Sequence, residues 1–321
     1  MLESIETFKG VAMDRQWTTG QVARALGVSE ASIKRWCDSG VIACGRTAGG
    51  HRRVPWQGVI QFVRESGQRL LRPEALGMPE GIGRGRGVAG RAAGQVAEAL
   101  ERGEFERLRR IGWGLYLGGH PAREIFDDVL APAFCAIGGR WQHGEIEVYQ
   151  ERRACEMCMR FLRELLRAIP PPPEEAPYAI GGTLAGDEYT LGAHMAEIVL
   201  REAGWRAECY GLGLPAATWC AAMEKTKPRL VWLSVSWVES VPTFVEEARM
   251  LCGCAEQYGV ALMVGGRALS ERIRQQFPYS AYGDNFQHLA AFAGTLWRPR
   301  EGDVRGGFAK AAGSGDAGLE G

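Results

Sequence analysis

The chain has 321 residues, of which 46% are hydrophobic and 24% are charged. This length suffices for two or three domains with their own cores, and these fractions are those of ordinary globular protein. The sequence has no apolar run of the roughly 20 residues that cross a bilayer, and its start lacks the pattern of a signal peptide. We therefore expect a cytoplasmic protein without membrane association.

Basic and acidic residues balance at 38 each, so any nucleic-acid binding must come from a local patch. Residues 24–53 contain such a patch, because six arginine and lysine residues there accompany only two acidic ones. The nine cysteines of a cytoplasmic chain are expected to be reduced thiols rather than disulfides.

The first element in chain order is a pair of short helices with a tight turn between them. Thr18-Thr19-Gly20-Gln21 has the spacing of a capping box, and Gly27 should end the helix that follows. Ser29 should cap a second helix whose inward residues are Ile33 and Trp36. This spacing predicts a helix-turn-helix, whose second helix enters the major groove with Ser32, Lys34 and Arg35 facing outward.

A basic hairpin follows, with two glycines at its tip and a basic returning strand. Such a wing lies along the phosphate backbone. Residues 17–63 resemble the DNA-binding module of MerR and excisionase proteins, whose wing commonly reads R-T-x-G-G-H-R-R. The resemblance implies double-stranded DNA as a partner, contacted from the wing by Arg46, His51, Arg52 and Arg53. His51 could equally brace the wing through a hydrogen bond.

Changes in composition divide the chain. The segment 73–95 is rich in Gly, Pro, Ala and Arg without periodicity, which predicts a flexible linker and an independently moving DNA-binding head over 1–72. Four consecutive prolines from Pro170 predict a stiff spacer at the end of a helical block over 96–170. Residues 171–298 form the next domain, and the tail 299–321 is expected to be disordered.

The sequence of the block over 96–170 predicts several helices, and such helices can enclose a ligand cavity between them. Pro121 should open a helix that Gly138-Gly139 ends. A later helix places Glu151 on its buried stripe, where the carboxylate needs either an arginine or a ligand as its partner. Cys155 and Cys158 have helical spacing and no second pair nearby, which favours core cysteines over a metal site.

Strands and helices alternate at short intervals over residues 178–296. This alternation predicts right-handed βαβ units and a doubly wound parallel sheet, whose ligands bind beyond the carboxyl ends of the strands. The loops at that edge are Asp187–Gly192, Ser234–Ser236, Gly265-Gly266 and Tyr282-Gly283. Glycines there permit close approach to the backbone, and serines offer hydrogen bonds.

In this order and spacing the loops resemble the cobalamin-binding signature D-x-H-x-x-G, S-x-L and G-G. The cap residues Trp141 and Glu151 resemble those of cobalamin-dependent methyltransferases and CarH-type light-responsive regulators. The resemblance implies a multidomain transcriptional regulator with a winged helix-turn-helix, a four-helix cap and an α/β flavodoxin-like domain, and with neither catalytic residues nor metal ligands. It implies a cobalamin pocket formed by Trp141, Glu151, Arg152, Asp187, Tyr189, Gly192, Ser234, Ser236, Gly265 and Gly266.

Tyr189 and Arg152 depart from this pattern, because the family carries histidine at both positions. A phenol is a poorer cobalt ligand than a neutral imidazole. His194 lies five residues after Tyr189, inside a helix, and is not expected to replace the missing ligand. The pocket therefore has three candidate occupants: a corrinoid without a protein ligand on cobalt, another tetrapyrrole such as haem, or none.

A homodimer or homotetramer is expected, because one short helix-turn-helix gives limited affinity for DNA. A corrinoid shuttle or methyltransferase-type subunit is the alternative from another class, but the helix-turn-helix and the missing histidine oppose it. A purely architectural DNA-binding protein would explain only the first seventy or so residues.

Overall fold

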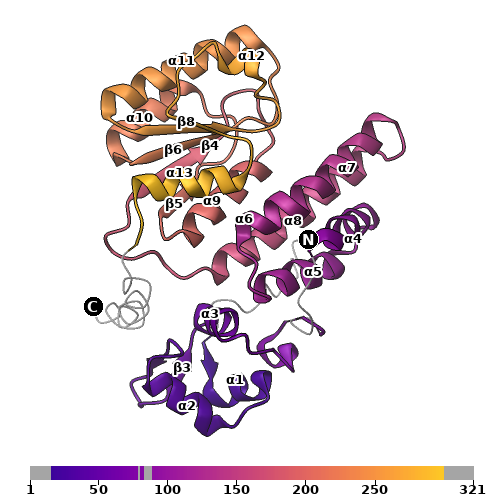
Figure 1. Ribbon diagram of the computed structural model, residues 1–321, viewed down its shortest axis with the longest axis vertical. Coiled ribbons are helices and arrows are strands. Elements are labelled where there is room, and N and C mark those ends of the chain that lie inside the picture. Colours follow the sequence, from indigo (N-terminus) through magenta and orange to yellow (C-terminus); the bar gives the residue numbers. More distant parts are fainter. Residues whose placement is uncertain (1–15, 79, 83–88, 300–321) are drawn as a thin grey trace, which may run out of the picture.

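The structure is a computed structural model that describes residues 16–78, 80–82 and 89–299. Three parts follow one another along the chain: a helix-turn-helix domain, a helical cap and a sheet domain (Figure 1). Within these ranges we find no helix with the length and apolar character that a membrane span requires. The predicted tail lies outside the described residues, apart from Pro299.

The predicted helix-turn-helix is confirmed. Thr18 caps α1 (Thr19–Leu26) in a reciprocal capping box with Gln21, and Gly27 ends the helix with a left-handed φ of 69°. The side chain of Ser29 caps α2 (Glu30–Asp38), whose Ile33 is fully buried. Leaving the α-helical region at Gly27 costs glycine little, so the chain turns sharply there and α2 can pack across α1.

A small antiparallel sheet and a third helix complete this domain. The strands β1 (Trp17–Thr18), β2 (Gly45–Arg46) and β3 (Arg52–Val54) have the order β1-β3-β2, so the hairpin between β2 and β3 is the predicted wing. The helix α3 (Trp56–Ser66) follows.

The segment 73–95 differs from the flexible linker that its composition predicted. A 3₁₀ turn, η1 (Pro73–Leu76), packs on α1, and the helix α4 (Ala89–Arg102) begins inside the segment. Leu76, Met78 and Ile82 are buried among the glycines, so a few apolar side chains supply the contacts that order this part of the chain. Residues 79 and 83–88 lie outside the description.

The cap contains four helical segments, one of them interrupted. These are α4, α5 (Phe105–Leu117), the series α6 (Ala122–Ile125), η2 (Phe126–Leu130) and α7 (Ala131–Gln142), and α8 (Val148–Ala168). The π-turn η2 stands before Pro132, which has no N–H for the bond to the carbonyl four residues earlier. The prediction that Gly138-Gly139 ends the helix is wrong, because both glycines keep helical geometry and the chain turns only at Gly144, with a φ of 71°.

The helix-turn-helix domain packs against the cap, whereas the sequence predicted an independently moving head. The Gln57 side chain donates a hydrogen bond to the backbone oxygen of Arg167 at 2.8 Å. Trp56 meets Trp113 edge to face with ring centroids 5.9 Å apart. The helix α3 carries this contact and lies largely inside the predicted module of residues 17–63. The sequence of the module does not indicate that this helix packs on the cap, so the docking was not predicted.

The sheet domain confirms the predicted doubly wound parallel fold. Its strands have the order β5-β4-β6-β7-β8, and their bounds are β4 (Tyr178–Gly182), β5 (Arg206–Cys209), β6 (Leu230–Ser234), β7 (Ala261–Gly265) and β8 (Ala281–Gly283). The strand order reverses between β4 and β6, and such a reversal opens a crevice at the carboxyl ends of the two strands.

Helices cover both faces of this sheet (Figure 1). Leu230 and Trp232 face α9 (Leu191–Glu202) and α13 (Phe286–Leu296), whereas Val231 and Leu233 face α10 (Ala216–Thr226) and α11 (Val241–Tyr258). The short α12 (Glu271–Arg274) follows β7. Successive side chains of each strand point to opposite faces of the sheet, and both faces are apolar. The core on the α9 and α13 face is continuous with the cap, whereas the core on the α10 and α11 face lies within the sheet domain.

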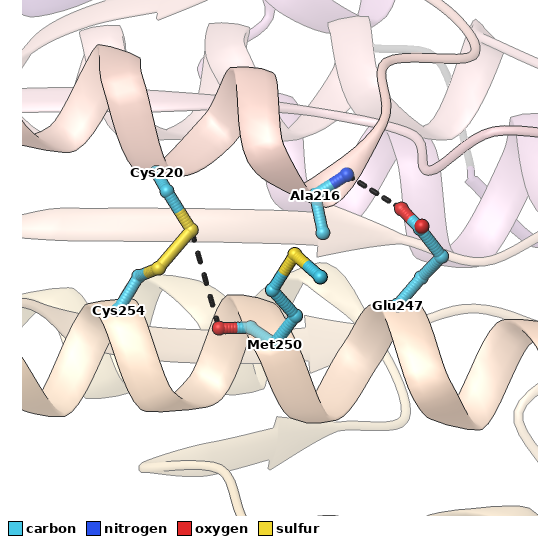
Figure 2. Close-up of a disulfide and its surroundings, with 5 residues drawn as sticks. All are labelled: Ala216, Cys220, Glu247, Met250 and Cys254. Atoms are coloured by element: carbon cyan, nitrogen blue, oxygen red, sulfur yellow. Dashed lines mark hydrogen bonds between the residues drawn. A yellow bond between two sulfur atoms is a disulfide. The ribbon is translucent and has the colours of Figure 1, made fainter.

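A disulfide joins Cys220 of α10 to Cys254 of α11, which corrects the expectation that all cysteines are reduced (Figure 2). The two helices lie side by side, with the Cα atoms of the pair 5.5 Å apart. Glu247 accepts a hydrogen bond from the Ala216 backbone at 2.6 Å nearby. The cysteines are 34 positions apart in the sequence, and no local pattern there shows that they lie close together.

Candidate functional site

The outward face of α2 carries the basic side chains that the sequence predicted for DNA. Lys34 and Arg35 are exposed and Ser32 is half-buried. Lys34 pairs with Glu30 at 3.1 Å, one turn earlier on the same helix. Arg35 has no ion-pair partner among the described residues, so its guanidinium is available to a phosphate or a base edge.

The wing places its arginines in two different settings. Arg52 donates to Asp38 at 2.7 Å from Nη2 and at 3.1 Å from Nε, and Arg46 reaches the same carboxylate at 3.3 Å. These contacts fasten the wing to the end of α2. Arg53 has no ion pair within the described part of the chain. The exposed His51 bonds to Thr47 through its backbone: its N–H donates to the Thr47 hydroxyl at 3.2 Å, and its carbonyl oxygen accepts the Thr47 N–H at 2.9 Å. The sequence assigned the three arginines alike to DNA contact and left His51 open between DNA contact and bracing. Among the described residues, Arg46 and Arg52 pair with Asp38, whereas Arg53 has no ion pair.

A cavity of about 650 Å³ lies between the cap and the carboxyl ends of the strands. The cap contributes α7 and the start of α8, and the sheet domain contributes the start of α9 and the loops after β6, β7 and β8. Nine of the ten residues predicted for a cofactor line it: Trp141, Glu151, Arg152, Tyr189, Gly192, Ser234, Ser236, Gly265 and Gly266.

Glycines form much of the cavity's floor because neighbouring atoms leave no room for side chains. A Cβ at Gly266, whose φ is 126°, would lie 2.2 Å from the carbonyl oxygen of Val235. At Gly192 it would lie 2.8 Å from the Ser234 hydroxyl. Because these positions can hold only glycine, their backbone lies uncovered at the wall of the cavity. A large planar ligand can then approach that backbone closely.

Asp187 does not line the cavity, although the sequence placed it in the site. Its side chain is buried and accepts the backbone N–H groups of Tyr189 at 3.0 Å, Ser236 at 2.6 Å and Trp237 at 3.1 Å. Burial raises the pKa of this carboxyl, while the three N–H donors oppose that rise. Asp187 therefore joins the loop before α9 to the loop after β6 and shapes the floor from behind.

Tyr189 lies between two cations at the place where the resemblance expects histidine. The Arg152 guanidinium carbon lies 5.4 Å from the centre of the Tyr189 ring, and that of Arg267 lies 5.8 Å from it. Arg152 belongs to the cap and Arg267 to the sheet domain, so the tyrosine bridges the two walls through cation–π contacts. Arg267 was missed from sequence, although it directly follows Gly265-Gly266.

Trp141 and Glu151 form the opposite wall. Trp141 is 45% exposed and lines the cavity, so it offers an aromatic surface to a ligand there. Glu151 has Arg152 at 3.8 Å and accepts a hydrogen bond from the Cys155 thiol at 3.4 Å. Glu151 was predicted to pair with either an arginine or a ligand. The structure gives it Arg152 as a neighbour and also places it in the lining of the cavity, so a ligand partner stays a prediction. Burial raises the pKa of Cys155 to about 12, so this thiol is protonated at neutral pH.

His194 is not among the described residues that line the cavity. It faces Glu197 and Cys209 instead, and these two neighbours raise its pKa to about 9 by favouring the imidazolium, Cys209 more than Glu197. Further lining residues were missed from sequence because their helices approach the cavity only in the fold, among them Asp127, Cys135 and Met195. Asp127 also accepts the N–H groups of Phe286 and Gln287 at 2.9 and 3.0 Å, which ties the cap to α13.

Comparison with known proteins agrees with this arrangement. Residues 18–67 match the helix-turn-helix domain family, and residues 92–166 match the B12 binding domain family. The two domains in one chain define a DNA-binding transcriptional regulator with a cobalamin-binding-type sensory domain. Among individual proteins, the chain is similar to the HTH-type transcriptional repressor CarH of Myxococcus xanthus, with 26% identity over 273 residues, which cover 79% of this chain and 90% of that protein.

The monomethylamine corrinoid protein of Methanosarcina barkeri has the same fold in its cap and sheet. The TM-score is 0.54 at 18% identity, over 63% of this chain and 96% of that one. These comparisons confirm the predicted CarH-like architecture over most of the chain: a helix-turn-helix domain followed by a cobalamin-binding-type cap and sheet.

Proposed function

We propose that this chain is a transcriptional repressor, not an enzyme, that holds a corrinoid in the cavity without a protein histidine on cobalt. The observation that carries the proposal is the lining of the cavity. The cap that forms one wall belongs to the stretch that matches the B12 binding domain family, yet the described residues that line the cavity include no histidine. Repression is inferred from the relative, which is named a repressor.

The residues present fit a large planar ring with a nucleotide tail. Trp141 offers an exposed aromatic face on the cap side, and Gly192, Gly265 and Gly266 offer bare backbone on the sheet side. Ser234 and Ser236 supply hydroxyls at the strand ends, where a nucleotide base would pass. When bound, a corrinoid would supply a cobalt centre that can accept a further ligand.

Arg152 and Tyr189 stand where the resemblance expects two histidines, and they cannot both act as ligands of cobalt. Arg152 is a permanent cation and Tyr189 is held between Arg152 and Arg267. A bis-histidine adduct of the kind that CarH-type regulators form after photolysis therefore has no ligands here. We expect weak binding of adenosylcobalamin and no light-dependent change of oligomeric state through these positions.

DNA recognition is assigned to α2 and the wing, with Arg35 and Arg53 as the unengaged cations. One helix-turn-helix buries a small interface, so we propose that a homodimer or homotetramer binds repeated half-sites. The helix α9 connects the two functions, because Leu191 and Gly192 at its start line the cavity and Glu202 at its end holds the helix-turn-helix domain.

The experiment described below also distinguishes this proposal from two alternatives. In the first alternative the cavity binds haem, or it binds no ligand and the domain serves oligomerisation alone. A corrinoid shuttle or methyltransferase-type subunit is favoured by the fold shared with the corrinoid protein, but such a subunit has no use for a DNA-binding domain.

The test is a titration of the full chain with adenosylcobalamin, and separately with haem, followed by absorbance spectra and size-exclusion chromatography in darkness and light. The double variant Tyr189→His/Arg152→His should bind adenosylcobalamin at least about tenfold more tightly if only ligation was lost. Tyr258→His, on the far face of the sheet domain, is the control. Tight binding by the wild type with the spectrum of histidine-ligated cobalt would overturn the proposal, and haem binding alone would replace the corrinoid.

A further inference from the structure

A second candidate site lies on the other side of α9 from the cavity. His194 and Glu197 of α9 and Cys209 at the end of β5 each offer one potential ligand atom, and these atoms lie within 4.8 Å of one another. The distance between His194 Nδ1 and Glu197 Oε2 is 3.3 Å.

Local structure explains why these three residues meet. His194 and Glu197 are one turn apart on α9, so their side chains share a face. On β5, Cys209 has the same orientation as the buried Ala207, which faces the core beneath α9. Because an α-helix turns about 100° per residue, the cavity-lining Gly192 and Ala196 lie on roughly the opposite face of α9 from His194.

We propose that His194, Glu197 and Cys209 bind a zinc ion. Imidazole nitrogen, thiolate sulfur and carboxylate oxygen are the donors that zinc accepts, whereas magnesium and calcium prefer oxygen alone. Atoms bound to a tetrahedral zinc at about 2.0–2.3 Å lie about 3.3–3.8 Å apart. The Nδ1–Oε2 distance already has this value, and rotation of the side chains would bring the thiolate to the same spacing.

The surroundings allow an ion to reach the site. The His194 side chain is 27% exposed, while that of Glu197 is 11% exposed, so the site opens to solvent on its histidine side. Three protein ligands leave the fourth zinc position for water or for a further ligand. The ion would tie the first half of α9 to the edge strand β5, directly behind the cavity floor.

The experiment uses the full chain, stripped of metal with a chelator and kept in a thiol-free reductant. Zinc binding is measured by calorimetry, and cobalt(II) serves as a spectroscopic probe because a thiolate ligand gives it an intense charge-transfer band. We expect one zinc per chain and a rise in unfolding temperature on binding. The variants Cys209→Ser and His194→Gln should each weaken zinc binding by at least about 100-fold, and Cys209→Ser should abolish the cobalt–thiolate band.

Matched controls are Cys44→Ser in the helix-turn-helix domain and His288→Gln on α13, neither of which lies in the cluster. Both should bind zinc as the wild type does, and circular dichroism should show all four variants folded. A wild type that binds no zinc, or a Cys209→Ser variant that retains the thiolate band, would overturn the assignment. The site lies outside the cavity, so either result leaves the corrinoid titration of the wild type to be judged separately.

Discussion

Arg64 of α3 and Glu202 at the end of α9 form a salt bridge of 3.1 Å, although 138 residues separate them. Arg64 also donates to the backbone oxygens of Tyr116 at 2.6 Å and His120 at 3.1 Å. Glu202 in turn accepts the N–H of Ala122 at 2.7 Å. One ion pair thus holds the helix-turn-helix domain, the cap and the sheet domain together.

Replacement of Arg64 should loosen this junction. Arg64→Ala leaves the largely buried Glu202 without its cation, and we expect the free energy of unfolding to fall by about 2 kcal/mol in urea denaturation. Limited proteolysis should also release the helix-turn-helix domain faster. Arg69→Ala, at an exposed position nearby, is the control and should change neither measurement. Equal stability and equal rates of proteolysis in the two variants would mean that Arg64 does not hold the helix-turn-helix domain to the cap and the sheet domain.

The two neighbouring wing arginines should have different effects on DNA binding. Arg53→Ala removes an unengaged cation, so the slope of log K against log salt should become shallower by about one unit in anisotropy titrations. Arg52→Ala should instead free Asp38 and loosen the wing, which lowers affinity together with thermal stability. An unchanged salt slope in Arg53→Ala would remove this residue from the interface.

Loss of the Asp187 carboxylate should separate the loops beneath the cavity. Asp187→Ala leaves three backbone N–H donors without their acceptor, and we expect a loss of about 3 kcal/mol in stability. Ligand binding should weaken as well, although Asp187 does not line the cavity. Asp128→Ala, at an exposed position of the cap, is the comparison and should stay within about 0.5 kcal/mol of the wild type. A similar loss in both variants would argue against a bracing role for Asp187.

The cysteine pair on α10 and α11 should resist alkylation until a reductant is added. Iodoacetamide followed by peptide mass spectrometry should label the exposed Cys135 at once, but Cys220 and Cys254 only after reduction. Cys220→Ser/Cys254→Ser should lower stability by about 3 kcal/mol relative to the oxidised protein. Immediate labelling of both cysteines in the oxidised protein would contradict the pairing.

Local signals in the sequence were sufficient for the elements and their order. The Thr18–Gln21 capping box, the turns at Gly27 and the alternation of strands and helices are short-range features, and each is present in the structure. The glycines at 192, 265 and 266 were predicted from the resemblance to the cobalamin-binding signature. The structure adds the physical reason for them, because a Cβ at Gly192 or Gly266 would clash with neighbouring atoms.

The sequence by itself determined the classes of domain and the absence of histidine at 152 and 189, because both depend on residue identity and short spacing. Only the tertiary structure decided that Arg52 braces the wing, that Asp187 supports the floor from behind, and that α3 docks on the cap. It also brought His194 to Cys209 and Cys220 to Cys254. Each of these relationships joins residues on different elements, and their distance is set by how the helices and strands pack, which no local pattern records.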